Sequence, residues 1–359
     1  MSGVGRDERA WDLLARAPAH TGDGDEDASL ALLHHELAQD RMSGASVTGR
    51  YEDLSGLDLF GQDGRVDVKW GRLSIDAVAE HDRLDSAASP VIGAIHTDEA
   101  KAGLGVTFKG PISDARLGAG AYGFASGFVP YALGGLRLEP LGGLSLDVEG
   151  LYHQRPTDTA ALRAAALKDS AELEIAWRFA ERYLVAAAGG ATNYTDRAGA
   201  FLASGATGRM ELSALLRKAA PLVRLRADGF VEANRLAATM PAGVAAVVQP
   251  GTPVDEVLPE TYGTAGVGLT LLGLTDNEDD MGTARGPLAC RRCLRPFADV
   301  WAGWLMPAQR LTYSLDAGLG YLFARHQELA ATGFYRTDQG GLIGQRYAGF
   351  SLHYALRWL

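Results

Sequence analysis

Apolar and polar residues alternate along most of the chain, and the last stretch shows the pattern most clearly. From Phe350 to Trp358 the even-numbered positions are apolar, whereas the odd-numbered positions are mostly polar or small. A period of two predicts an extended strand with one apolar and one polar face. The apolar face also carries aromatic residues near both ends. We interpret this stretch as the closing strand of an outer-membrane barrel, with lipid outside and water inside.

The same alternation recurs from Gly44 onward. In residues 223–234, for example, arginine and carboxylate side chains share one parity and Val, Leu, Ala and Gly share the other. The pattern predicts sixteen strands, at residues 46–55, 63–70, 72–81, 101–109, 113–124, 130–139, 144–154, 170–179, 182–195, 209–218, 222–234, 261–273, 297–307, 310–322, 327–337 and 344–359.

Two features favour this count. The polar parity reverses at Gly71, and a reversal at glycine indicates a bulge or a tight hairpin, which we take as a hairpin. An even number of strands also puts the longer connections, including 82–100, 155–169, 196–208 and 235–260, on the outer side. The connection 274–296 is the exception, because it is long but falls on the periplasmic side.

The fold class follows from these patterns. We predict an all-β protein, a 16-stranded antiparallel transmembrane β-barrel over residues 44–359, with a short N-terminal helical segment. Residues 1–43 form that segment, because leucines recur at helical spacing between Ala28 and Met42. A soluble β-sandwich gives similar alternation and remains the alternative.

Composition narrows the class of protein. The net charge of −10 argues against nonspecific nucleic-acid binding. No apolar run reaches the roughly 18 residues of a membrane-spanning helix. The N-terminus has no apolar export signal, so we expect a chain that has lost its signal or is a piece of a longer protein.

The polar faces of the predicted strands form the expected lumen wall. Ten charged residues are assigned to this wall and to the path of a substrate: Asp147, Glu149, Glu172, Glu174, Arg178, Arg224, Arg226, Asp228, Glu232 and Asp316. Charges that line a hydrated pore select the passing molecule by sign. The carboxylates near 147–149 and 172–174 favour a cationic or neutral polymer, whereas Arg224 and Arg226 argue against a purely acidic channel.

Cys290 and Cys293 form a Cys-x-x-Cys motif inside the connection 274–296. A tetrahedral metal site needs about four ligands, and the chain has no other cysteine. A redox motif normally opens a helix beside a strand, which is not the pattern here. We favour a small local disulfide in an oxidising compartment, and we expect no metal and no cofactor.

Nothing in the sequence indicates catalysis. There is no Gly-x-Ser-x-Gly elbow and no phosphate-binding loop with its lysine. Carboxylates two apart, such as Asp147 and Glu149, share one face of a strand, which is expected of a solvated wall. We therefore expect a protein that is not an enzyme.

Several segments resemble the C-terminal barrel of exopolysaccharide exporters, the group that serves cellulose, poly-N-acetylglucosamine and Pel secretion. The resemblance rests on Leu33-His-His-Glu-Leu-Ala-Gln-Asp-Arg-Met42, on Gly44-Ala-Ser-Val-Thr-Gly-Arg-Tyr-Glu-Asp-Leu-Ser-Gly-Leu57, and on Gly71-Arg-Leu-Ser-Ile75. Val257-Leu-Pro-Glu-Thr-Tyr-Gly and Leu294-Arg-Pro-Phe-Ala-Asp-Val-Trp look most like the Pel exporter.

The resemblance implies an outer-membrane porin of sixteen strands that exports a polysaccharide for biofilms. It also implies a periplasmic tetratricopeptide scaffold, a polymer-modifying enzyme and, indirectly, an inner-membrane synthase complex as partners. Residues 1–43 would then be the junction to that scaffold, since one repeat alone takes about 34 residues.

Our expectation is therefore a bacterial outer-membrane porin, in contact with lipid, that passes a secreted and possibly cationic exopolysaccharide through a charged lumen gated by loops. Two alternatives stay open. One is a general porin or an electron-conduit barrel, and the other is a soluble all-β carbohydrate-binding or hydrolase protein.

Overall fold

The structure, a computed structural model, describes residues 42–87, 92–110, 112–180, 182–217, 222–272, 293–324 and 327–358. The predicted N-terminal helices lie outside these residues. So does Cys290, and so does the side chain of its neighbour Cys293. The expected disulfide is therefore neither supported nor contradicted.

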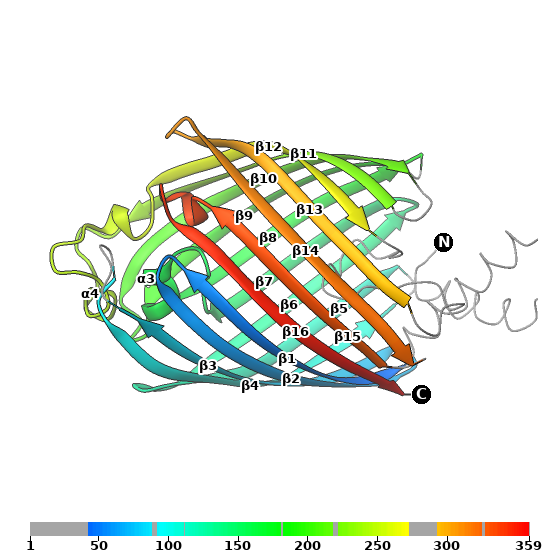
Figure 1. Ribbon diagram of the computed structural model, residues 1–359, viewed down its shortest axis with the longest axis horizontal. Coiled ribbons are helices and arrows are strands. Elements are labelled where there is room, and N and C mark those ends of the chain that lie inside the picture. The colour runs from blue at the N-terminus through cyan, green and yellow to red at the C-terminus, as the bar shows by residue number, and fades with distance from the viewer. Residues whose placement is uncertain are drawn as a thin grey trace, which may run out of the picture.

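The described chain forms one closed antiparallel barrel of sixteen strands, in which each strand pairs with its neighbours in sequence (Figure 1). The predicted fold class is confirmed. The strands are β1 (Ser43–Leu54), β2 (Leu57–Trp70), β3 (Leu73–Ser86), β4 (Ile95–Lys109), β5 (Ser113–Phe124), β6 (Gly127–Leu141), β7 (Leu144–Gln154), β8 (Ala166–Phe179), β9 (Tyr183–Asp196), β10 (Phe201–Arg217), β11 (Leu222–Leu236), β12 (Thr261–Leu272), β13 (Cys293–Met306), β14 (Arg310–Ala324), β15 (Gln327–Thr337) and β16 (Arg346–Trp358).

Closure of the barrel joins the first and last strands. Strand β16 pairs with β1 over twelve positions, from Ser43 opposite Trp358 to Leu54 opposite Tyr347. The predicted hairpin at Gly71 is also confirmed, because β2 and β3 pair directly and Gly71 has φ +58°. Glycine adopts this left-handed conformation at little cost, as a two-residue hairpin requires.

Several predicted boundaries are wrong, because β2, β4 and β10 begin at Leu57, Ile95 and Phe201 and not at residues 63, 101 and 209. The expected outer loop 196–208 is only four residues long, because β10 begins at Phe201. Residues 203–208 pair with both β9 and β11. Residues 203–208 are all small (Ala-Ser-Gly-Ala-Thr-Gly), so the alternation of large apolar and polar side chains that marks a strand is faint there.

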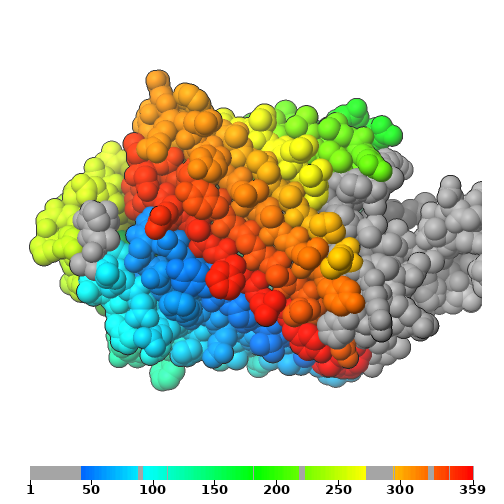
Figure 2. Space-filling model, viewed as in Figure 1, coloured from blue at the N-terminus to red at the C-terminus, as the bar shows by residue number. Residues whose placement is uncertain are grey.

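Large apolar side chains cover the outer face of the barrel. Phe128 is 85% exposed, Leu117 70% and Trp70 61%, and residues of this kind occur on nearly every strand. Figure 2 shows this outer surface over β1, β2 and β13–β16. A single-layer sheet with such a surface lacks the buried apolar face of a soluble sandwich and fits a lipid environment. Among the described residues, no helix has both the length and the apolar composition of a membrane span.

The apolar core lies at the barrel end opposite the start of β1 and the end of β16 (Figure 1). It is built from connections: α3 (Ala160–Ala165) between β7 and β8, and α4 (Ala242–Ala245) and η1 (Val254–Glu256) between β11 and β12. We call residues 155–165 and 237–260 the mouth plug. Its members Leu162, Val244 and Leu258 are fully buried.

The mouth plug lies inside the cylinder. Its core includes Leu54 of β1, Leu84 of β3 and Tyr347 of β16, which lie in one part of the ring, and Tyr194 of β9, which lies on the opposite side of the ring. One small cluster can reach all these strands only from the interior. Because the longest described connections are at this end, the usual asymmetry of bacterial barrels makes it the outer mouth.

Backbone and side-chain hydrogen bonds tie the mouth plug together. Thr159 caps α3 by accepting from the Leu162 amide, and its hydroxyl donates to the Val257 carbonyl at 3.0 Å. The amide of Gly93, in the connection between β3 and β4, donates to the Val247 carbonyl at 2.8 Å. The two connections of the mouth plug and Gly93 of the β3–β4 connection are therefore joined by hydrogen bonds, although they are distant in sequence.

Candidate functional site

The inner face of the barrel can be followed from strand to strand. Asp82 of β3 and Glu99 of β4 bind Arg163 of the mouth plug, so their side chains face the interior. Residues directly opposite one another in an antiparallel pair share a face, and alternate residues on each strand share it too. The pairing register therefore carries this face around the whole ring.

All ten residues that the sequence assigns to the lumen wall have the parity of this inner face. They are Asp147 and Glu149 on β7, Glu172, Glu174 and Arg178 on β8, Arg224, Arg226, Asp228 and Glu232 on β11, and Asp316 on β14. Whether a substrate passes over them remains a prediction. Their surroundings differ, however, and divide them into three groups.

The first group is an acidic quartet on two neighbouring strands. Asp147 lies directly opposite Glu174, and Glu149 lies opposite Glu172. Like charges directly opposite one another destabilise a sheet, so this arrangement is not explained by folding. The side chains of Glu149, Glu172 and Glu174 are 35%, 46% and 30% exposed, which keeps their carboxylates hydrated.

Three arginines border the acidic quartet without neutralising it. Arg116 of β5 binds Glu149, and Arg209 of β10 binds Glu174 and lies 3.8 Å from Glu172. Arg116 reaches Glu149 by crossing Gly135 of β6, where a Cβ atom would lie 2.6 Å from the arginine Nε. Arg137 of β6 lies directly opposite Asp147 and is 3.4 Å from Glu139. With Glu139 counted, five carboxylates stand against three guanidinium groups, so this part of the wall is acidic.

The second group is a set of paired charges on β10–β13. Arg224 donates to Glu211 at 2.8 Å and to Ser213 at 3.1 Å. Arg226 makes a two-pronged contact with Asp299, at 3.1 and 2.7 Å. These arginines therefore have carboxylate partners and add little free positive charge to the wall. On the same face, Asp228 accepts a hydrogen bond from Trp301.

The remaining residues occupy other positions along the barrel. Glu232 is 1% exposed and accepts hydrogen bonds from Tyr194 and Tyr262 at 3.2 and 3.1 Å, so it belongs to the packing beneath the mouth plug. Asp316 lies 3.4 Å from Arg336. Arg178 is exposed near the barrel end at which β1 begins and β16 ends.

A buried ionic cluster, which sequence reasoning missed, fastens the mouth plug to the wall. Arg163 of α3 donates to Glu99 at 2.7 Å and to Asp82 at 2.9 Å, and Arg155 donates to Asp82 at 2.7 Å. Arg197 adds a contact with Glu99, and Arg155 one with Glu80. The Asp82 and Glu99 side chains are fully buried.

Burial affects the two flanking arginines of this cluster differently. For Arg155, burial disfavours the charge, but attraction to Asp82, Glu80 and Glu99 outweighs it and raises the pKa. For Arg197, burial dominates over the attraction of Glu99 and lowers the pKa. Arginine stays charged in either case, so the cluster remains ionic at neutral pH.

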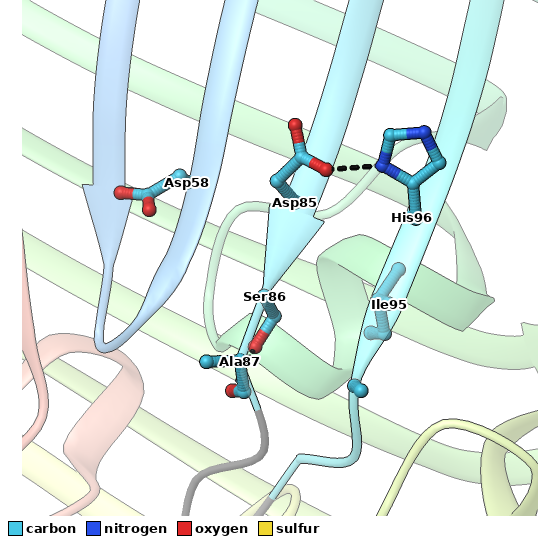
Figure 3. Close-up of a pocket in the computed structure, with 7 residues that line it drawn as sticks. Asp58, Asp85, Ser86, Ala87, Ile95 and His96 are labelled. Atoms are coloured by element: carbon cyan, nitrogen blue, oxygen red, sulfur yellow. Dashed lines mark hydrogen bonds and ion pairs between the residues drawn. The ribbon is translucent and has the colours of Figure 1, made fainter.

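A separate pocket of about 390 Å³ opens at the rim of the mouth (Figure 3). Asp85 and His96 are hydrogen-bonded in it, and Asp58 lies opposite Asp85 in the pairing register. These residues have the parity of the outer face, so the pocket is not part of the interior. Among the described residues, no cluster of histidine, cysteine or carboxylate side chains has the arrangement of a metal site.

A closed barrel with an apolar exterior and a charged interior defines the class of protein as an outer-membrane β-barrel. A family model described as "PelB, C-terminal beta barrel domain" matches residues 39–357. The chain therefore belongs to this family, which confirms the resemblance noted in the sequence and places the protein in the bacterial outer membrane. Fold and family together exclude the soluble alternative.

Among the similar solved structures, one agrees with this fold. A structure titled "Bacterial polysaccharide outer membrane secretin" has a TM-score of 0.64 at 10% identity, over 89% of this chain and 99% of that chain. Pseudomonas aeruginosa OccK11 (OpdR) has a TM-score of 0.42 at 11% identity, over 89% and 97%. Pseudomonas aeruginosa OpdO has a TM-score of 0.43 at 10% identity, over 88% and 96%. No curated protein matches significantly.

Proposed function

We propose that the barrel is the outer-membrane conduit for a secreted exopolysaccharide that carries positive charge. The acidic quartet is the observation that carries the proposal. It concentrates four carboxylates on the inner face, keeps them accessible to water and leaves them incompletely paired. The family and the polysaccharide secretin of similar fold support a polysaccharide as cargo.

Transport in this proposal is passive. The barrel supplies a hydrated wall along which the polymer slides, and the sign of the wall charge decides which polymer enters. Ammonium groups on the polymer are attracted by the acidic quartet. The paired arginines on β10–β13 do not repel them, because Glu211 and Asp299 neutralise Arg224 and Arg226. The chain acts as a conduit and not as an enzyme.

The mouth plug is the gate in this mechanism. It occupies the interior at the outer mouth, and the buried ionic cluster holds α3 against β3 and β4. An emerging polymer has to displace this unit. The partners we propose are outer-membrane lipid, a periplasmic tetratricopeptide scaffold with its polymer-modifying enzyme and, indirectly, an inner-membrane synthase.

Charge reversal at the acidic quartet tests the proposal. We expect the double variant Glu172→Lys and Glu174→Lys to fold and to change the ion selectivity of the pore from cations toward anions. The reversal potential in planar bilayers under a salt gradient measures this selectivity. In cells that depend on this barrel, secretion of the cationic polymer should fall in parallel.

The matched control is Asp98→Lys, which adds a lysine at a 63% exposed position with outer-face parity near the rim. This variant should leave selectivity and secretion unchanged. Unaltered selectivity in the quartet variant would contradict the proposal. Ion conduction that is insensitive to any polymer would instead indicate a general porin.

A further inference from the structure

Trp301 of β13 lies flat against the inner wall of the barrel. A Cβ atom built on Gly266 of β12 would lie 2.6 Å from the indole ring, and one built on Gly303 would lie 2.5 Å from it. Gly266 and Gly303 are direct partners in the pairing register, and both have the parity of the inner face. Gly266 and Gly303 therefore form a shallow depression, the glycine seat, in which the indole ring lies. Any residue with a Cβ atom at either position would clash with the ring.

A hydrogen bond fixes the ring in this seat. The indole Nε1 donates to Asp228 of β11 at 2.5 Å, which anchors the edge of the ring two strands away. Trp301 remains partly exposed, although one face of its ring is covered by the glycines. The opposite face of the indole is directed at the barrel interior.

Charged groups surround one edge of the indole. Arg226 lies over Gly268, the register partner of Trp301, where a Cβ atom would lie 2.8 Å from the arginine Nε. The guanidinium is held by Asp299 and lies 3.3 Å from Asp228. A flat aromatic surface is thus bordered by a fixed hydrogen-bond donor and a fixed acceptor.

A second ring continues this arrangement along β13. Phe297 covers Gly318 of β14, where a Cβ atom would lie 2.3 Å from the phenyl ring. Phe297 is also partly exposed. It is four residues from Trp301, or about 13 Å of extended strand, and it shares the inner face. Two aromatic surfaces are therefore spaced along the proposed path.

From this geometry we propose that Trp301 is a pyranose-binding subsite within the barrel, with Asp228 and Arg226 contacting sugar hydroxyl or amino groups and Phe297 supporting a further unit. The proposal rests on the proposed function, because it assigns part of the wall to the same polymer. The C–H groups on one face of a pyranose are apolar and slightly positive, which complements the negative face of an indole. The bordering charges supply the polar contacts that orient a bound sugar.

The subsite and the acidic quartet would play different roles. The quartet, on β7 and β8, is separated from β13 by the four strands β9–β12. It responds to the charge of the polymer, whereas Trp301 responds to the shape and apolar face of the sugar ring. Neutral and cationic sugars should therefore distinguish the two sites.

Binding of short sugars to the purified barrel in detergent tests this assignment. The probes are a hexamer of glucosamine and a hexamer of N-acetylglucosamine, and the readout is the dissociation constant from isothermal titration calorimetry. Trp301→Ala should weaken binding of both hexamers by about three- to tenfold. Trp301→Phe keeps a flat ring but loses the bond to Asp228, and it should retain part of the affinity.

Trp304→Ala is the matched control, since Trp304 is on the same strand with outer-face parity and is 48% exposed. It should bind both hexamers as the unaltered protein does. Resistance of each folded variant to SDS before boiling verifies that the barrel is intact.

The outcomes separate the subsite from the proposed function. Replacing Glu172 and Glu174 with Gln should weaken binding of the glucosamine hexamer alone. Normal binding of both hexamers by Trp301→Ala, together with that loss in the quartet variant, would overturn the subsite and leave the proposed function standing. Dependence on Trp301 without dependence on the quartet would support the subsite and contradict a cationic cargo. Binding of neither hexamer by the unaltered barrel would overturn the subsite.

Discussion

The buried ionic cluster at the mouth and the acidic quartet lower in the barrel use the same residue types in opposite ways. At the mouth, Asp82 and Glu99 are fully buried. Their partners are Arg50 of β1, Arg155 and Arg163 of the β7–β8 connection and Arg197 of the β9–β10 connection. In the quartet, Glu172 is 46% exposed and its partner Arg209 is 51% exposed. Buried charges need their partners to stay folded, whereas hydrated charges are free to act on molecules that pass. The buried ionic cluster therefore stabilises the structure of the mouth, whereas the acidic quartet can act on a passing polymer.

The largest effect is expected from Arg163→Ala, which removes the central guanidinium of the buried ionic cluster. Arg155, Arg50 and Arg197 still contact Asp82 or Glu99, so we expect a loss of roughly 3 kcal/mol in the stability of the closed mouth. The mouth plug should open more often, which raises single-channel conductance in planar bilayers. Arg163→Lys keeps the positive charge but loses the planar guanidinium that binds Glu99 and Asp82 together. This variant should give an intermediate conductance. Unchanged conductance in both variants would show that the buried ionic cluster does not hold the mouth plug closed.

A smaller effect is expected from Tyr262→Phe beneath the mouth plug. The substitution removes one of the two hydroxyl groups that donate to the buried Glu232. Loss of one such hydrogen bond to a charged group costs about 1.5–3 kcal/mol. The denaturant midpoint of the unfolding transition should fall accordingly, with Tyr313→Phe on the exposed outer face as the control. Equal midpoints for the two variants would contradict a structural role for Glu232.

A still smaller effect on stability is expected from Arg209→Ala, which removes the arginine bound to Glu174 of the quartet. Exposed ion pairs contribute about 0–1 kcal/mol, so the unfolding midpoint should hardly change. The local negative charge increases, however, and cation selectivity should rise in the planar-bilayer measurement. A large loss of stability without a change in selectivity would show that the quartet is structural after all.

The smallest effect concerns the response to salt. At 1 M salt the screening length is about 3 Å, so hydrated charges lose most of their reach, whereas buried pairs are screened much less. Cation selectivity should weaken as salt rises from about 0.1 to about 1 M, while the mouth stays closed. Opening of the mouth at high salt would mean that water reaches the buried ionic cluster.

The sequence predicted the barrel because alternation is a local property of each strand. Phe350, Leu352 and Trp358 show their outer face without reference to any other segment. The same parity placed Asp147 and Glu174 on one inner face. It did not predict that they lie directly opposite one another. Where small residues blur the alternation, as in residues 203–208, the strand was missed.

The tertiary structure decided which side chains meet. Arg163 and Glu99 are 64 residues apart, and Trp301 and Asp228 are 73 apart, so no sequence spacing links them. Glu232 has the parity of a lumen residue but becomes buried because the mouth plug folds over it. The glycine seat of Trp301 also depends on the register between β12 and β13. Two-residue periodicity fixes the face that a side chain occupies, whereas its partners are fixed only when the ring closes and its connections fold inward.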